Sequence, residues 1–450
     1  MSDRESADLL IEPRWLLPVS PTAAVLEDQA VAVADGRILA VGPAVELRQR
    51  FAVCERIVRE RHVLLPGLVN AHTRATHILL RGLGRGALRG HPHAGCGTPE
   101  SCEGADFVRD GTRLAIAEML RAGITCFADL SPLPAEAART AAAAQVRALI
   151  ALPVSDAPTS CGENATAHLA KAEALWDEYR AHPRIGLYFA PLQGAALSDA
   201  TLTRLRRVAD ELDARIAMPL RARGDAAQGA HRAAGGAVSG VEDSAAPPSH
   251  TASLRPLERL LSLGLVRPGF AAIGALDCDA AGAELLERHG AALIGCPDSE
   301  LRLGAAPAAL PLLSGDRSAL GSDSASCGGA LDLLAQMRTA ALLGGLEARV
   351  AVRLATLGGA TALGLAAEIG SIEAGKAADL ACLDLGSLGC THASAVADAV
   401  VFGATRSQVS DVWTAGRAAV SAGRVIVFDE AELAALPLEW ARRLTLECAA

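Results

Sequence analysis

The sequence contains few aromatic residues, which make up only 3% of its 450 residues. Because single-stranded nucleic acids are held largely by stacking of bases on aromatic side chains, this scarcity argues against such a ligand. The formal net charge is −9, and no long basic run offsets it. We therefore expect neither a nucleic-acid partner nor binding to an anionic membrane.

Long apolar runs and a cysteine framework are also missing. No apolar segment reaches the roughly 18 residues that span a bilayer, and the N-terminus lacks the basic and apolar regions of a signal peptide. The eleven cysteines are odd in number and scattered without a regular spacing. In a chain of this size they are typical of reduced thiols in a cytoplasmic protein.

Apolar residues, mainly Ala and Leu, make up 51% of the chain, which is long enough for one large barrel domain and a smaller domain. From Val63 onward, short β-rich runs alternate with helical patterns such as residues 107–122, where Asp106 is expected to cap the helix and Gly123 to end it. The β-rich runs are 63–70, 124–130, 147–153, 185–191, 215–220, 270–276, 291–296 and 318–323. Eight strands alternating with helices predict an α/β fold, a parallel TIM (β/α)8 barrel.

The two ends of the chain have a different pattern, with short apolar runs separated by turns and an Asp35-Gly36 hairpin signal. We predict that residues 1–62 and 369–430 form one composite β-sandwich domain. Residues 63–368 are then the barrel, and residues 431–450 a terminal amphipathic helix.

Two segments, 84–104 and 222–250, are rich in Gly, Ala, Ser and Pro and lack periodicity, so we expect mobile loops on the face of the barrel that carries active sites. The first loop contains four residues of metal-ligating types: His91, His93, Cys96 and Cys102. Their spacing matches no established zinc pattern, which favours chance occurrence, although a separate metal site there stays open.

Several stretches of the chain resemble the amidohydrolase superfamily, and most of all its branch of methylthioadenosine/S-adenosylhomocysteine deaminases and triazine hydrolases. They are "PGLVNAHT" (66–73), "FVRDGTRLAIAEMLRAGITCFAD" (107–129), "ALGSDSAS" (319–326) with "DLLAQMRTAALL" (332–343), "ATLGGATALGLAAEIGSIEAGKAADL" (355–380) and "RPLERLLSLGLVRPGF" (255–270). The resemblance implies one zinc ion held by three histidines and one aspartate at barrel strand ends. The zinc activates a water for attack on an aromatic carbon that bears an amino group, and a glutamate relays a proton.

This sequence departs from that pattern at most of the implied positions. Where the superfamily has His-x-His after the first strand, this chain has His72-Thr73-Arg74. The third ligand histidine falls on Pro219 and the proton-relay glutamate on Ala222, and three further histidine positions fall on Leu192, Gly274 and Gly295. Only His72 and the aspartate Asp323 remain as ligands. Two ligands are too few for a catalytic zinc, so we expect no metal.

Arg74 cannot replace a histidine ligand, because its guanidinium is always charged and has no lone pair to donate. We expect instead that Arg74 pairs with Asp323, whose carboxylate would otherwise be buried without a partner. Arg221 is the alternative partner. His77, on an apolar face, is expected to be a core or interface histidine.

The sequence therefore predicts a catalytically inactive amidohydrolase homologue, a pseudoenzyme. Its role would be small-molecule binding in the barrel mouth, homo-oligomerisation, or association with an active paralogue. The alternative is an active zinc hydrolase of C–N bonds. It would be either an aminohydrolase acting on an adenosine-like or other heterocyclic amine, or a hydrolase that uses displaced ligands such as His91 and His93. A chain without function, a decayed duplicate, is a third possibility.

Overall fold

The computed structural model describes residues 4–81, 104–192, 194, 197–220, 254–274, 278–302 and 307–449. Except for Gly104, the two segments expected to be mobile loops lie outside the described residues. The candidates Arg221, Ala222, His91, His93, Cys96 and Cys102 therefore lie outside them as well.

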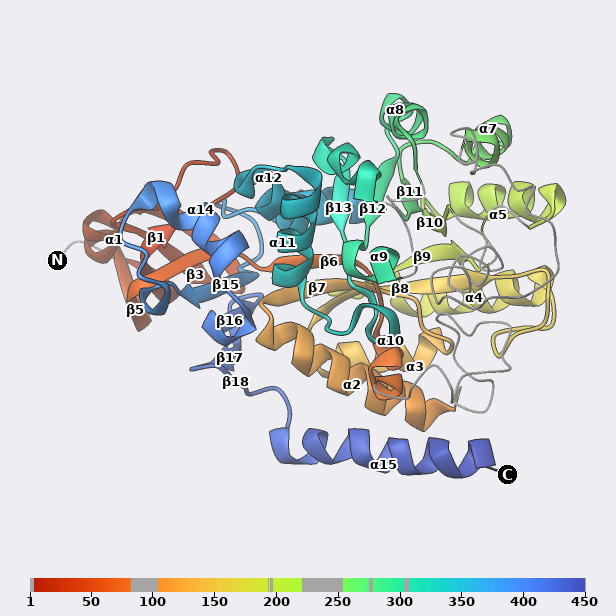
Figure 1. The fold of residues 1–450 in the computed structure, drawn as a ribbon. Helices are drawn as coiled ribbons and strands as arrows, with labels where there is room; N and C mark the ends of the chain where they lie inside the picture. The colour runs from red at the N-terminus through yellow and green to blue at the C-terminus, as the bar shows by residue number, and fades with distance from the viewer. Residues whose placement is uncertain are drawn as a thin grey trace, which may run out of the picture.

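Segments from both ends of the chain share one mixed sheet (Figure 1). Its strands are β1 (Glu5–Leu16), β2 (Leu26–Glu27), β3 (Gln29–Ala34), β4 (Arg37–Pro43), β5 (Phe51–Pro66), β15 (Leu380–Asp384), β16 (Val409–Thr414), β17 (Arg417–Ser421) and β18 (Arg424–Val425). The order is β18-β17-β16-β15-β5-β1-β3-β4, with β2 on β1, so the antiparallel β5–β15 pair joins the two ends. At the predicted hairpin between β3 and β4, Asp35 and Gly36 both have positive φ, 50° and 74°.

The second sheet is the predicted barrel. Its strands are β6 (Leu68–Arg74), β7 (Ile124–Asp129), β8 (Arg147–Val154), β9 (Ile185–Pro191), β10 (Arg215–Pro219), β11 (Phe270–Ile273), β12 (Ala292–Gly295), β13 (Ser318–Leu320) and β14 (Asp323–Ser324). Neighbours along the order β13-β12-β11-β10-β9-β8-β7-β6-β14 are parallel. The eighth predicted strand is divided: its first part, β13, pairs with β12, and its second part, β14, pairs with β6, which closes the ring.

The start of the first barrel strand was predicted wrongly. Residues 63–66 belong to β5 and pair with β15 in the small sheet, and the barrel strand begins only at Leu68. Gly67 separates the two strands. A side chain at this position would lie 2.1 Å from Oγ1 of Thr125, so only glycine fits between the two sheets.

Helices and short helical turns connect the strands. They are α1 (Ala44–Arg50), α2 (Ala105–Arg121), α3 (Pro134–Ala143), α4 (Ala165–Tyr179), α5 (Asp199–Glu211), α7 (Leu254–Ser262), α8 (Ala280–Arg288), α9 (Pro297–Arg302), α10 (Ala325–Gly328), α11 (Leu333–Gly344), α12 (Ala348–Arg353), α13 (Gly359–Leu363), α14 (Val396–Asp398) and α15 (Glu430–Ala449). The predicted cap of α2 was wrong, because its N-cap is Gly104 and Asp106 lies in the first turn, where it pairs with Arg109 at 2.7 Å. No described helix is both long and apolar enough to cross a membrane.

The C-terminal helix α15 lies along the outer face of α2 (Figure 1). Trp440 of α15 makes an edge-to-face contact with Phe107, with ring centroids 5.1 Å apart, and its indole Nε1 donates a hydrogen bond to Asp110 at 3.1 Å. Glu432 pairs with Arg113 at 2.9 Å. One aromatic anchor and two polar contacts therefore hold α15 against the barrel.

Small side chains fill the interior of the barrel, as the abundance of Ala in the sequence suggests. The inner cluster contains Val69, Ala71, Cys126, Ala128, Leu149, Ala151, Tyr188, Ala190, Ala217, Ala271 and Ala292. Because this interior is packed, ligands can reach the barrel only at its ends.

Candidate active site at the barrel mouth

The closure of the barrel brings the first and last strands together at their carboxyl ends. In the parallel β6–β14 pair, Asp323 lies opposite Thr73, one residue before Arg74. Nε of Arg74 lies 3.4 Å from Oδ1 of Asp323, and the two side chains are only 13% and 16% exposed. The ion pair expected from the sequence is therefore present and mostly buried.

The remaining contacts of Asp323 complete a polar cluster. Nε2 of His72 lies 3.5 Å from Oδ1, and the hydroxyl of Ser299 donates a hydrogen bond to Oδ2 at 2.6 Å. Burial alone would raise the pKa of Asp323, but the contact with His72, the charge of Arg74 and the Ser299 hydrogen bond outweigh it and hold this pKa well below its usual range. The Asp323 carboxylate is therefore ionised and compensated by protein groups.

A second carboxylate, missed in the sequence, lies near Arg74. Asp129, the last residue of β7, is fully buried; its Oδ1 accepts a hydrogen bond from the Ala75 amide at 2.8 Å, and its Oδ2 has no hydrogen-bond partner among the described residues. Burial raises the pKa of Asp129 to about 7, against the opposing effects of the Ala75 amide and Arg74. Burial and the nearby Asp129 raise the pKa of the Tyr188 phenol as well. Its position at the end of a predicted barrel strand is the feature of the sequence that could have identified Asp129 as a candidate site residue.

The other described positions of the implied site offer no ligating side chain. Leu192 follows β9 in a turn, and Pro219 ends β10 opposite Ile273. Gly274, with a φ of 108°, donates its amide to the carbonyl of Ile294 at 2.9 Å. The carbonyl of Gly295 accepts from the Gly321 amide at 2.8 Å. Gly274 and Gly295 thus contribute only backbone hydrogen bonds to neighbouring segments.

The described residues do not fit the divalent metal that the family resemblance implies. Within the described part of the chain, no group of three or more His, Cys, Asp or Glu residues could hold a metal ion. His72 and Asp323 supply two donors, fewer than the three protein ligands that a catalytic zinc needs. The charged guanidinium of Arg74 beside the same carboxylate would also repel a cation. No catalytic step through a metal can be derived from this arrangement.

Two neighbouring residues explain how the mouth is packed. His77 is buried as predicted, and its Nδ1 lies 2.8 Å from the hydroxyl of Ser324. Gly321 allows the eighth strand to approach β6, because an added Cβ there would lie 2.7 Å from the carbonyl oxygen of His72. The His77–Ser324 contact and the close approach at Gly321 therefore both hold the last strand against β6.

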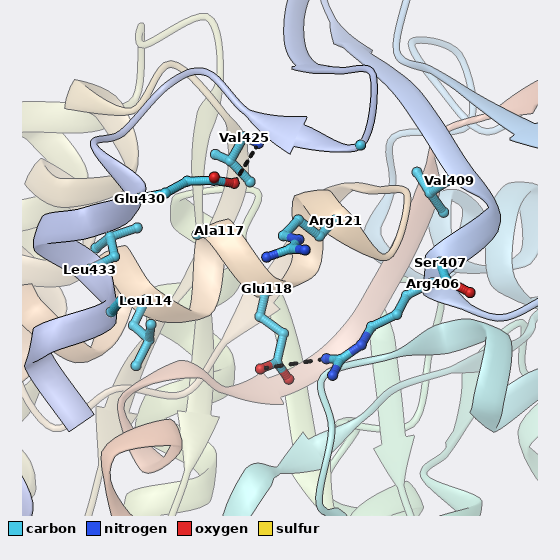
Figure 2. Close-up of a pocket in the computed structure, with 12 residues that line it drawn as sticks. Leu114, Ala117, Glu118, Arg121, Arg406, Ser407, Val409, Val425, Glu430 and Leu433 are labelled. Atoms are coloured by element: carbon cyan, nitrogen blue, oxygen red, sulfur yellow. Dashed lines mark hydrogen bonds and ion pairs between the residues drawn. The ribbon is translucent and has the colours of Figure 1, made fainter. Parts of the chain in front are cut away.

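A cavity of about 520 Å³ lies on the outer surface of the barrel between α2, the β16–β18 edge and α15. Figure 2 shows Glu118 and Arg406 facing each other across it, and Glu430 accepting a hydrogen bond from the Val425 amide. Glu118 is also held by Arg81 at 2.7 Å. The lining of this cavity includes none of the residues of the barrel mouth described above.

The fold defines a TIM-barrel protein with a small β domain built from both ends of the chain. The sequence profile described as the Amidohydrolase family matches residues 63–419, and the chain belongs to this family. The profile of the imidazolonepropionase-like composite domain of bacteria matches residues 30–52.

Similar proteins extend over the whole chain. It is 31% identical to a 5-methylthioadenosine/S-adenosylhomocysteine deaminase of Teredinibacter turnerae over 99% of both chains. The crystal structure of an adenosine deaminase from Xanthomonas campestris with bound zinc is 35% identical, with a TM-score of 0.86 and coverage of 98% of this chain and 100% of that one. The atrazine chlorohydrolase TrzN from Arthrobacter aurescens, crystallised with zinc, shares the fold at 19% identity, with a TM-score of 0.79 and coverage of 96% and 99%.

Proposed function

We propose that this amidohydrolase-family protein lacks ordinary zinc-dependent deaminase activity, because an arginine–aspartate ion pair takes the place of the metal. The observation that carries the proposal is the 3.4 Å contact between Arg74 and Asp323 at the junction of the first and last strands. The guanidinium supplies the positive charge that balances the carboxylate, but it cannot hold or ionise a water as a metal does.

The proposed role follows from what the mouth retains. Arg74 and His72 present cationic and hydrogen-bonding groups, and Asp129 has a buried oxygen without a partner among the described residues. Such groups suit binding of a small polar molecule without turnover. Assembly with further copies or with an active paralogue is compatible with the same fold, because the barrel core does not depend on catalytic groups.

The competing candidate is an active aminohydrolase for an adenosine-like or other heterocyclic amine, with zinc bound by residues outside the described part of the chain. It is favoured by two relatives, at 31% and 35% identity, which are named as deaminases. The two candidates differ in one measurable property, the zinc content of the purified protein. They differ also in ammonia release from 5-methylthioadenosine.

Restoring the implied ligands tests the proposal. The variant Arg74→His/Pro219→His/Ala222→Glu would bring the histidines to three and add the relay carboxylate, while the strained position Gly274 stays unchanged. We expect about one zinc per chain in this variant and well below one in the parent, since about three protein ligands plus water complete the coordination.

The matched control is Arg50→His, an exposed arginine in the small domain that pairs with Glu5. It should bind no more zinc than the parent. Stoichiometric zinc in the parent would contradict the proposal directly.

A further inference from the structure

A separate cavity of about 280 Å³ lies at the opposite end of the barrel, where β8, β9 and β10 begin. Arg147 and Arg215 are the first residues of β8 and β10. The amino ends of parallel strands form the face away from the site described above, so this cavity is independent of the barrel mouth.

The lining of this cavity is strongly basic. It includes four arginines, Arg147, Arg180, Arg184 and Arg215, and one carboxylate, that of Asp213. Arg147 is already neutralised by Asp379 at 3.1 Å, and the exposed Arg180 has a distant partner in Asp177 at 3.9 Å. Within the described part of the chain, Arg184 and Arg215 have no ion pair. Asp213 is the only carboxylate of the described lining, and it lies beyond ion-pair distance of both arginines, so their positive charges are only partly balanced.

The surroundings of Arg215 give the stronger argument for a bound anion. Its guanidinium lies against Gly364, where an added Cβ would be 2.1 Å from Nε. Its one described hydrogen bond is a long one, 3.4 Å, to the carbonyl of Ala362. Burial lowers the pKa of Arg215, Asp213 opposes this effect and Arg317 adds to it. A half-buried cation with no carboxylate within ion-pair distance costs free energy, and a bound anion would recover part of it.

The remaining walls of the cavity are apolar and aromatic. Trp176 and Tyr179 come from the last turn of α4, and Leu363 and Leu365 from the region around the C-terminus of α13. Small-molecule sites typically combine such walls with a few polar groups that fix orientation. The lining therefore has a cationic end and an apolar side.

We propose that this cavity binds a small phosphomonoester, with its phosphoryl group paired to Arg184 and Arg215 and its apolar or aromatic body against Trp176. A phosphate dianion matches two guanidinium groups in charge and accepts paired N–H donors in their planar geometry. A carboxylate carries half of that charge. The volume of about 280 Å³ restricts the ligand to a small molecule.

Isothermal titration of the full chain with phenyl phosphate, inorganic phosphate and benzoate, at constant ionic strength, tests the proposal. Phenyl phosphate is expected to bind, and benzoate to bind about tenfold more weakly because it has one charge fewer. Arg215→Gln and Arg184→Gln should each weaken phenyl phosphate by about 10- to 100-fold, the loss of a charge-assisted hydrogen bond. Arg349→Gln, an exposed arginine of α12 outside the cavity, is the charge-matched control and should bind as the parent does.

Circular dichroism confirms that each variant is folded, and Arg184→Gln keeps the test valid should Arg215→Gln fail to fold. Three results would overturn the proposal: no heat with phenyl phosphate, equal binding by both cavity variants and the control, or inorganic phosphate binding as tightly as phenyl phosphate. The last result would remove the role assigned to Trp176.

Discussion

Replacing Arg74 by methionine tests the ion pair on which the barrel mouth depends. The change keeps the aliphatic stem and removes the charge, so that among the described side chains Asp323 retains only His72 and Ser299 as partners. Removing one partner of a buried ion pair costs about 3–5 kcal/mol, because the other charge is left buried. The pair here is 3.4 Å apart and slightly exposed, so we expect about 2–3 kcal/mol.

The assay is urea unfolding at pH 7 followed by tryptophan fluorescence, with a double-mutant cycle. Asp323→Asn removes the opposite charge, and the double variant should be more stable than the sum of the two single changes predicts. Arg288→Met, which breaks an exposed pair with Glu284, is the control and should leave the midpoint unchanged. Additive effects of Arg74→Met and Asp323→Asn would refute the reasoning, because they would mean that the two charges do not interact.

Three further changes test other parts of the structure. The pKa of Asp129 is raised from 3.8 to about 7, so the stability that its neutral form provides is present below about pH 4 and is lost as the pH rises to about 7. Asp129→Asn should therefore gain stability over the parent across this window, by at most ~4 kcal/mol at pH 8, and equal pH profiles of urea midpoints would contradict this assignment. Gly321→Ala places a Cβ 2.7 Å from the His72 carbonyl oxygen and should reduce the free energy of unfolding by about 1–3 kcal/mol. The control is Gly42→Ala, whose Cβ meets nothing closer than 3.9 Å. Thermal midpoints that fall equally in the two variants would refute the packing argument. Trp440→Ala should reduce the local stability of α15 by about 3 kcal/mol, because it removes the contacts with Phe107 and Asp110. Limited proteolysis should then cleave α15 faster than in the parent. An unchanged cleavage rate would show that other contacts hold this helix.

The sequence predicts the strands and helices of the barrel well, since hydrophobic periodicity and turn residues mark them locally. The prediction fails at the start of the first barrel strand for a physical reason. Residues 63–70 are apolar almost throughout, and both halves are buried, one in each sheet. Only the pairing of Val63–Pro66 with β15, more than 300 residues away, distinguishes them, and local pattern carries no such information.

The candidate site could be predicted only in part, because some of its residues come together through contacts between segments that are separate in the sequence. Arg74 and Asp323 stand at positions that the family motif identifies, so their contact could be inferred. Ser299 reaches the cluster from α9, and Asp129 reaches the mouth from the end of β7 through the pairing of β7 with β6. Their side chains occur too widely in proteins for spacing alone to indicate a role.

Elemental analysis by plasma mass spectrometry tests the central claim most directly. The chain is purified without chelators in medium supplied with zinc, and the same sample is assayed for ammonia release from 5-methylthioadenosine. The ion pair between Arg74 and Asp323 predicts zinc far below one atom per chain and no ammonia release. About one zinc per chain, removed by chelator together with deaminase activity, would contradict the account.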